Sequence, residues 1–140
     1  MKRSASAVWQ GDLKKGKGTI STESGVLVDS QYSFSTRFES GKGTNPEELI
    51  AAAHAGCFSM ALSAALGKAG HTPDRINTTA AVTLDMIDGN PKITKVDLTL
   101  SARVPNISAA DFEKIANDAK ANCPVSKVLN AQISLAAKLE

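Results

Sequence analysis

Two cysteines are the residues of this 140-residue chain best suited to chemistry. Cys123 directly precedes Pro124, and a proline in that place suits the first turn of a short helix. A thiol at a helix N-terminus lies beside unpaired N–H groups and the positive end of the helix dipole. Both favour the thiolate, which is the nucleophilic form. Cys57 lies inside an apolar stretch, where a small buried core residue and a reactive thiol both remain open interpretations.

Three polar side chains are candidates to act with Cys57. Glu47 precedes it by ten positions, roughly 1000° of helical turn, so the two lie about 80° apart in projection and about 15 Å apart along the axis. They can share a site only through an intermediary, and Arg37, on a predicted strand, is a candidate for it. His54 lies one turn before Cys57 and is a candidate base or metal ligand. Each also has an ordinary interpretation: Glu47 as a first-turn acid, Arg37 as a solvated strand residue and His54 as a hydrogen-bonded helix residue.

Metal and phosphate sites are poorly supported by the spacing of the candidate ligands. The two cysteines, His54 and His71 make no C-x-x-C pair, so we expect no zinc site. The glycines flanking Lys17 are not followed by a predicted helix, which argues against a phosphate-binding loop.

The composition is that of one ordinary soluble domain, residues 1–140. Hydrophobic residues make up 42% and charged residues 21%, which excludes disorder as the main state. The net charge of +2 is too small to indicate nucleic-acid binding. Lys2 and Arg3 are followed by small and polar residues and not by an apolar segment, so we expect a cytoplasmic protein.

A long helix is predicted from Pro46 to about Lys68. Asn45 can cap its N-terminus, Glu48 sits where a capping-box partner would, and Gly70 suits a left-handed C-terminal cap. Residues 49–67 carry no formal charge and are numerous enough to span a bilayer, but alanine, serine, glycine and histidine interrupt the strongly apolar residues. We therefore expect no membrane span, but a helix buried on most sides within a soluble protein.

The other predicted elements complete an α+β chain. Alternation of side chains indicates strands, a turn signal indicates one long hairpin, and Ser108 and Pro124 each begin a helix. The expected strands are 8–10, 18–21, 32–39, 76–86, 93–104 and 132–138, with a turn at 88–91 and helices from 108 to 122 and from 124 to 129.

Three segments resemble the OsmC/Ohr family, the thiol-dependent peroxidases of organic hydroperoxides. They are Thr44–Leu49, Ala52–Ala61 and Cys123–Ser126. His54, together with residues 22–27 and 36–39, is similar to the OsmC branch. The resemblance runs along nearly the whole chain and implies an OsmC-like fold, with antiparallel sheets around a long central buried helix in an intertwined homodimer.

The resemblance also implies roles for four residues. Cys57 matches the family's peroxidatic cysteine and Cys123 its resolving cysteine, while Arg37 matches the arginine that contacts the thiolate and Glu47 the glutamate that holds this arginine. Peroxide would oxidise Cys57 to the sulfenic acid, and Cys123 would condense with it to a disulfide. The implied reductant is a dithiol, carried by a lipoyl-type group on a partner protein. The implied cycle needs no cofactor, neither metal nor flavin nor haem.

Two other functions remain open on the sequence. A long apolar helix wrapped by antiparallel sheet also suits a non-catalytic module that binds acyl groups in a hot-dog-like fold. A hydrolase using Cys57 and His54 is less well supported, because i, i+3 neighbours on one helix are poorly aimed at each other. Only the peroxidase cycle needs Cys123 as a resolving thiol.

Overall fold

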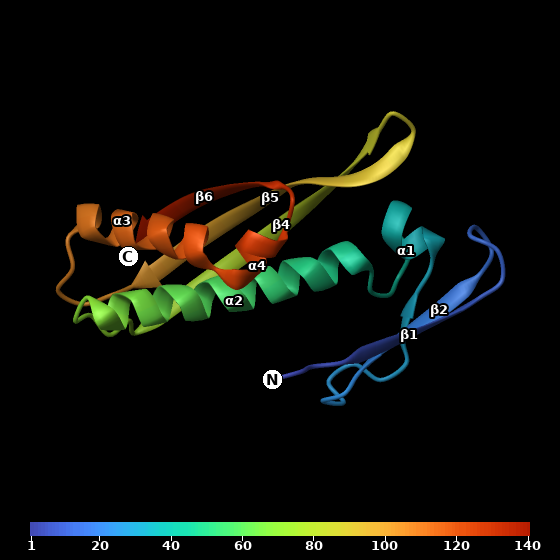
Figure 1. Cartoon of the computed structure of the whole chain (residues 1–140), viewed down its shortest axis with the longest axis horizontal. Coiled ribbons are helices and arrows are strands. Elements are labelled where there is room, and N and C mark those ends of the chain that lie inside the picture. The colour runs from blue at the N-terminus through green and yellow to red at the C-terminus, as the bar shows by residue number, and fades with distance from the viewer. The chain divides into compact units, whose positions relative to one another are not determined.

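The computed structural model describes residues 1–140, which form two compact units, residues 1–49 and residues 50–140. The first unit holds the antiparallel strands β1 (Ala5–Gln10), β2 (Lys17–Thr22) and β3 (Ser30–Tyr32), in the order β1-β2-β3 (Figure 1). Gly18 pairs with Trp9 on one side and Tyr32 on the other. A side chain at Gly18 would collide with both aromatic rings, whose centroids lie 5.3 Å apart. The central strand therefore needs glycine there.

The prediction of one strand over residues 32–39 is wrong. The strand ends at Tyr32, and α1 (Phe34–Phe38) follows at once. Ser33 caps this helix: its hydroxyl accepts the Thr36 N–H, and the Thr36 hydroxyl accepts the Ser33 N–H at 2.8 Å. Phe34 and Phe38, one turn apart, bring their ring centroids within 4.8 Å. Arg37 therefore lies in the last turn of a short helix and not on a strand.

The long helix α2 (Pro46–Lys68) has the predicted bounds. The Asn45 side chain accepts the Glu48 N–H at 2.8 Å, as an N-cap should. The Glu48 carboxylate accepts from the Thr44 hydroxyl at 3.0 Å, so it stabilises the preceding loop. Gly70, with φ of +86°, ends the helix in the left-handed conformation.

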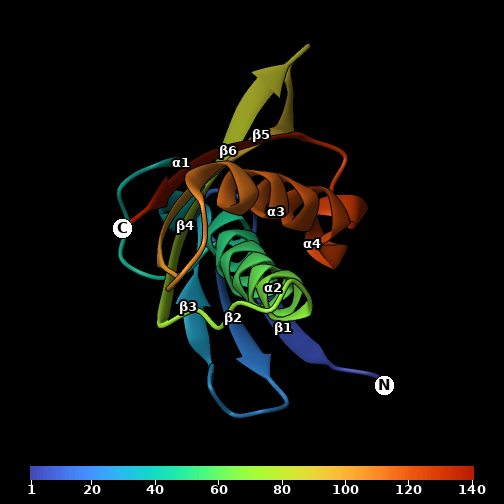
Figure 2. The same ribbon diagram turned by 90° about the vertical axis from the view of Figure 1, so that its left-hand side faces the viewer.

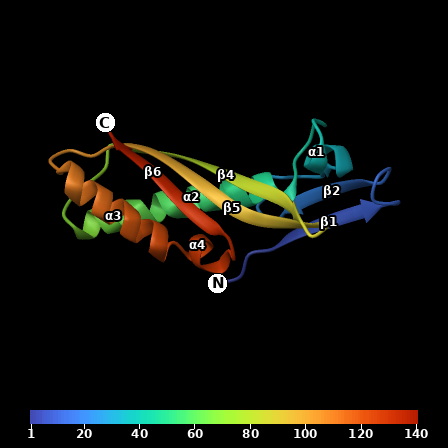
Figure 3. The same cartoon turned by 90° about the horizontal axis from the view of Figure 1, so that it is seen from above.

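The second unit holds a three-stranded sheet with helices on one face (Figure 2). Strands β4 (Arg75–Ile87) and β5 (Asn90–Arg103) form the predicted hairpin, closed by a turn of only two residues, Asp88 and Gly89, both with positive φ. Strand β6 (Gln132–Leu139) lies parallel to β5, so this sheet is mixed and not antiparallel as predicted. The connection between β5 and β6 contains α3 (Ala109–Asn122) and α4 (Pro124–Val128), seen from above in Figure 3.

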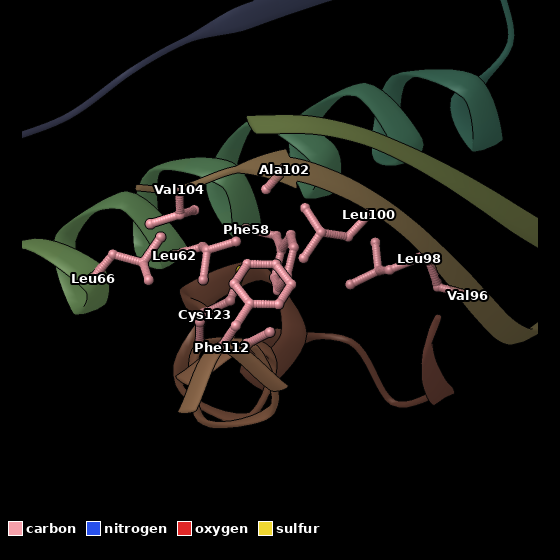
Figure 4. Packing of buried hydrophobic residues seen from close by; sticks show 12 residues of the cluster. Phe58, Leu62, Leu66, Val96, Leu98, Leu100, Ala102, Val104, Phe112 and Cys123 are labelled. Carbon is pink, nitrogen blue, oxygen red and sulfur yellow. The ribbon is translucent and has the colours of Figure 1, made fainter. Parts of the chain in front are cut away.

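The core of this unit lies between α2, the inner face of β5 and α3 (Figure 4). Alternate residues of β5 are buried there, as the predicted alternation requires. From α2 the core takes side chains four residues apart, and Phe58 lies at its centre (Figure 4). The apolar side chains with no exposed area are Phe58, Leu62, Leu66, Val96, Ala102, Ala116 and Cys123.

The prediction that α2 is buried on most sides does not hold for the single chain. Met60 is 77% exposed, and much of the helix surface away from the core is accessible. By length and composition alone α2 could cross a membrane, which is weak evidence for a single helix. His54, Phe58, Leu62 and Leu66 instead pack inside the protein.

Replacing Leu98 by alanine should lower the free energy of unfolding by about 2–5 kcal/mol, because Leu98 is 1% exposed and its loss leaves a cavity at the helix–sheet contact. The neighbouring Thr99 points to the exposed side of the same strand, and Thr99→Ala is the control. Urea denaturation of both variants measures the difference. Equal losses for the two would contradict this packing.

Candidate functional site

The two cysteines, far apart in the sequence, come together in the second unit. Cys57 lies in the middle of α2, and Cys123 joins α3 to α4 and is fully buried. Their Sγ atoms are 3.2 Å apart, and both thiols are free. A disulfide needs an S–S distance of about 2.05 Å, so a small movement joins the two sulfurs.

The surroundings shift the pKa values of the two thiols in opposite directions. Burial raises the pKa of the Cys57 thiol, a hydrogen bond from the Val125 N–H lowers it, and the neighbouring Cys123 raises it further. Burial also acts to raise the pKa of Cys123, but hydrogen bonds from the Ser126 N–H, the Cys57 thiol and the Ser126 hydroxyl outweigh it, and this pKa lies below its ordinary value. Because the two sulfurs are in contact, the protonation of each thiol affects the other. None of the groups that set the pKa of Cys57 is a cation.

His54 lies one turn before Cys57 and is completely buried. Its Nε2 lies 2.8 Å from the Ser126 hydroxyl, at hydrogen-bond distance, while its Nδ1 is buried without a partner. Burial lowers the pKa of His54, so the ring is neutral near neutral pH. Ser126 was not predicted as a site residue. It belongs to the Cys-Pro-Val-Ser segment, but no local signal reveals a partner 72 positions earlier.

The first unit pairs Arg37 with Glu47. Arg37 Nη2 donates to Glu47 Oε1 at 2.8 Å, and Arg37 Nε donates to both carboxylate oxygens at 3.1 and 3.2 Å. Glu47 is 9% exposed and sits in the first turn of α2, where an acidic residue also complements the helix dipole. This arrangement fixes the guanidinium group and leaves Nη1 without a bond to Glu47.

An apolar pocket of about 260 Å³ opens beside Arg37 in the same unit. The guanidinium carbon also lies 5.2 Å from the centre of the Phe38 ring. The pocket combines aromatic walls with one cationic side chain, which suits a ligand with an apolar body and a polar end. Among the lining residues are Trp9, Leu13, Tyr32, Phe34, Phe38 and Pro46. Nowhere in residues 1–140 do three His, Cys, Asp or Glu side chains come together as a set of metal ligands.

Most of this chain matches the sequence model of one protein family. The model of the family described as OsmC-like protein matches residues 39–138, most of the chain. The chain belongs to the OsmC-like family. The match includes Glu47 and both cysteines of the site, and Arg37 lies two residues before it.

Individual proteins of known name are also similar to this chain in sequence. The chain is 60% identical over 129 residues to Peroxiredoxin OsmC of Escherichia coli, with 92% of this chain and 90% of that protein covered. It is 34% identical over 101 residues to organic hydroperoxide resistance protein-like 1 of Staphylococcus epidermidis, with 71% of each chain covered. The high identity to the first protein supports the OsmC branch of the OsmC/Ohr family.

Solved structures show that the OsmC-like fold extends over the whole chain. The organic hydroperoxide resistance protein OhrB of Bacillus subtilis superposes with a TM-score of 0.71 at 26% identity, covering 96% of this chain and 98% of that chain. An OsmC-like protein of Vibrio cholerae superposes with a TM-score of 0.76 at 17% identity, covering 99% of each chain. The α+β fold predicted from the sequence is confirmed.

Proposed function

We propose that this chain is a peroxiredoxin-like peroxidase that reduces organic hydroperoxides to alcohols. Its 60% identity to a protein named Peroxiredoxin OsmC supports the enzyme class. The observation that carries the proposal is the 3.2 Å approach of the Cys57 and Cys123 sulfurs, since a two-cysteine peroxidase must bring these atoms into contact. A non-catalytic acyl-binding module would have no use for this contact.

In the proposed first step the Cys57 thiolate attacks the distal oxygen of the hydroperoxide. The S–O bond forms as the O–O bond breaks, and the alkoxide takes a proton and leaves as the alcohol. The sulfur is oxidised to the sulfenic acid. Because burial disfavours the Cys57 thiolate, we assign to Arg37 the positive charge that stabilises it and the departing oxygen. The two-point contact with Glu47 supports this role, because it holds the guanidinium in one orientation.

In the proposed second step Cys123 attacks the oxidised Cys57 sulfur. The disulfide bond forms, the S–O bond breaks, and the leaving hydroxide takes a proton and departs as water. The lowered pKa of Cys123 favours this step, because the thiolate is the attacking form. A dithiol must then reduce the disulfide by thiol–disulfide exchange, and we assign this to a lipoyl-type group on a partner protein.

The apolar pocket beside Arg37 supports an alkyl or fatty-acid hydroperoxide as substrate in preference to hydrogen peroxide. Burial of an alkyl chain contributes binding free energy that hydrogen peroxide cannot provide. Equal kcat/KM for an alkyl hydroperoxide and hydrogen peroxide would contradict this preference.

We further propose that the protein acts as a cytoplasmic homodimer. A helix with an exposed apolar face gives support to the dimer, because a second copy would remove residues such as Met60 from water. Sedimentation equilibrium tests it, and a monomer at micromolar concentration would contradict it.

The test of the peroxidase function is direct oxidation of the reduced protein. One equivalent of an alkyl hydroperoxide should remove both free thiols and lower the intact mass by two hydrogens, without a covalent dimer. Thiols are counted under denaturing conditions, and an equal amount of the corresponding alcohol is the control. Two thiols that survive the peroxide would exclude the proposed function.

A further inference from the structure

We propose that His54 and Ser126 are positioning residues that prepare Cys123 for the resolving step. His54 Nε2 lies 2.8 Å from the Ser126 hydroxyl. Ser126 follows Cys123 by three positions, in the first turn of α4, and its side chain is among the groups that lower the pKa of the Cys123 thiol. The Cys123 sulfur lies 3.2 Å from the Cys57 sulfur, and Cys57 follows His54 by one turn of α2, so the four residues gather inside one unit of the fold. The role as resolving-step residues rests on the proposed function.

The chemistry of the side chains indicates which group donates each hydrogen bond. A serine hydroxyl has one hydrogen, so Ser126 can donate to the Cys123 thiolate while its oxygen accepts from His54 Nε2–H. That tautomer leaves His54 Nδ1 as a bare lone pair, which agrees with Nδ1 being buried without a partner. The opposite tautomer would bury an N–H donor with no acceptor, the more costly arrangement.

The burial of His54 supports a role in positioning Ser126. A neutral imidazole inside an apolar core costs free energy unless its nitrogens are used, and here one nitrogen is used, on Ser126 alone. Cys57, on α2, is the titratable side chain among the groups that set the pKa of Cys123, and no carboxylate or cation is among them. The hydroxyl of Ser126 is therefore the main side chain, apart from Cys57 itself, that favours the Cys123 thiolate.

The proposed role applies to one chemical event. The Cys123 thiolate attacks the Cys57 sulfenic acid, the disulfide forms as the S–O bond breaks, and the hydroxide takes a proton from solvent and leaves as water. Losing the Ser126 hydrogen bond should slow this event and leave the preceding attack on the hydroperoxide unchanged. A purely structural role for His54 would disturb both events or neither.

The test separates the two events by mass. The reduced protein is mixed with one equivalent of an alkyl hydroperoxide and quenched in acid at intervals; the sulfenic acid adds one oxygen and the disulfide removes two hydrogens. In Ser126→Ala and His54→Leu we expect disulfide formation to slow about tenfold, the effect of one hydrogen bond to a charged group, with sulfenic acid formation changed by less than about twofold. In His54→Gln, whose amide can donate to Ser126, the rate should return to near the wild-type value.

The matched control is Ser59→Ala. Ser59 is a partly buried serine whose hydroxyl bonds to the Ala55 carbonyl and the Thr78 hydroxyl and has no hydrogen bond to either sulfur. It should leave both rates unchanged. Equal slowing of both events in His54→Leu and Ser126→Ala, or no slowing of disulfide formation, would overturn the proposal.

A second measurement is independent of peroxidase activity. In a Cys57→Ser background the ultraviolet absorbance of the Cys123 thiolate is titrated with and without Ser126→Ala. We expect the titration to move to higher pH when the hydroxyl is lost, because a donor to the thiolate has been removed. An unchanged titration would overturn the proposed contact even where the wild-type protein reduces hydroperoxides. A shifted titration in a protein that does not react with hydroperoxide would contradict only the proposed function.

Discussion

Replacing Cys57 by serine should abolish the reduction of an alkyl hydroperoxide, with a loss of kcat on the order of a thousandfold or more. A serine hydroxyl at this position is not ionised near neutral pH and cannot take up the peroxide oxygen as a sulfenic acid. The helix should be unaffected, since serine differs from cysteine by one atom and Cys57 is only partly buried. Consumption of hydroperoxide measures the loss, and a Cys57→Ser protein with near wild-type activity would contradict the assignment.

The companion variant Cys123→Ser should behave differently. It retains the first reaction with hydroperoxide, but the sulfenic acid on Cys57 persists and excess hydroperoxide oxidises it further to the sulfinic acid. Intact mass follows both products. A hydrolase that used Cys57 with His54 would lose its activity in Cys57→Ser but not in Cys123→Ser, so the pair of variants separates the two mechanisms.

The second large effect is expected from Arg37→Met, which should slow sulfenic acid formation about a hundredfold. Methionine keeps much of the side-chain length and removes both the charge and the donors. The proposed contact of Arg37 with the thiolate predicts a higher pKa of Cys57 in Arg37→Met than in its parent, measured as thiolate absorbance in a Cys123→Ser background. Arg37→Lys keeps the charge but loses the planar fork and should recover only part of the rate.

Arg75 provides the control for this experiment. It forms a second arginine–carboxylate pair, in which Nη2 donates to both oxygens of Glu140 at 2.7 Å. Arg75→Met removes the same chemical group from an exposed pair and should leave sulfenic acid formation unchanged. Similar slowing in both variants would mean that the effect of Arg37 is not specific.

Local signals in the sequence were sufficient for some elements. The bounds of α2 were predictable because Asn45, Pro46 and Gly70 act within one turn of each helix end. The alternation of Val96 to Ala102 likewise predicts which face of β5 is buried. In each case the residues that decide the structure are neighbours in the chain.

Residues 32–39 fit the spacing of both a strand and a helix. Tyr32, Phe34, Thr36 and Phe38 alternate as in a strand, yet Phe34 and Phe38 are also four residues apart, the spacing of a helical pair. The capping pair formed by Ser33 and Thr36 favours the helix. The apolar residues alone fit both periodicities, so they could not decide between them.

Tertiary contacts account for the other differences. The parallel pairing of β6 with β5 depends on the path of α3 and α4, which no local pattern encodes. The apolar surface of α2 extends all round the helix, so the inward face of His54, Phe58 and Leu62 was not distinguishable from the face that carries Met60. The family resemblance related Arg37 to Glu47 and Cys57 to Cys123, but it gave no partner for His54.

The proposed disulfide would join two cysteines that are 66 positions apart and would therefore change the covalent topology of the chain. In the reduced chain the segment between them is held only by noncovalent packing. In the oxidised chain it becomes a covalent ring, and by loop-closure entropy a ring of this length stabilises the folded state by roughly 4 kcal/mol. A single proteolytic cut at the exposed hairpin turn of Asp88 and Gly89 would therefore leave two fragments that separate under reducing, denaturing conditions and migrate as one species after peroxide.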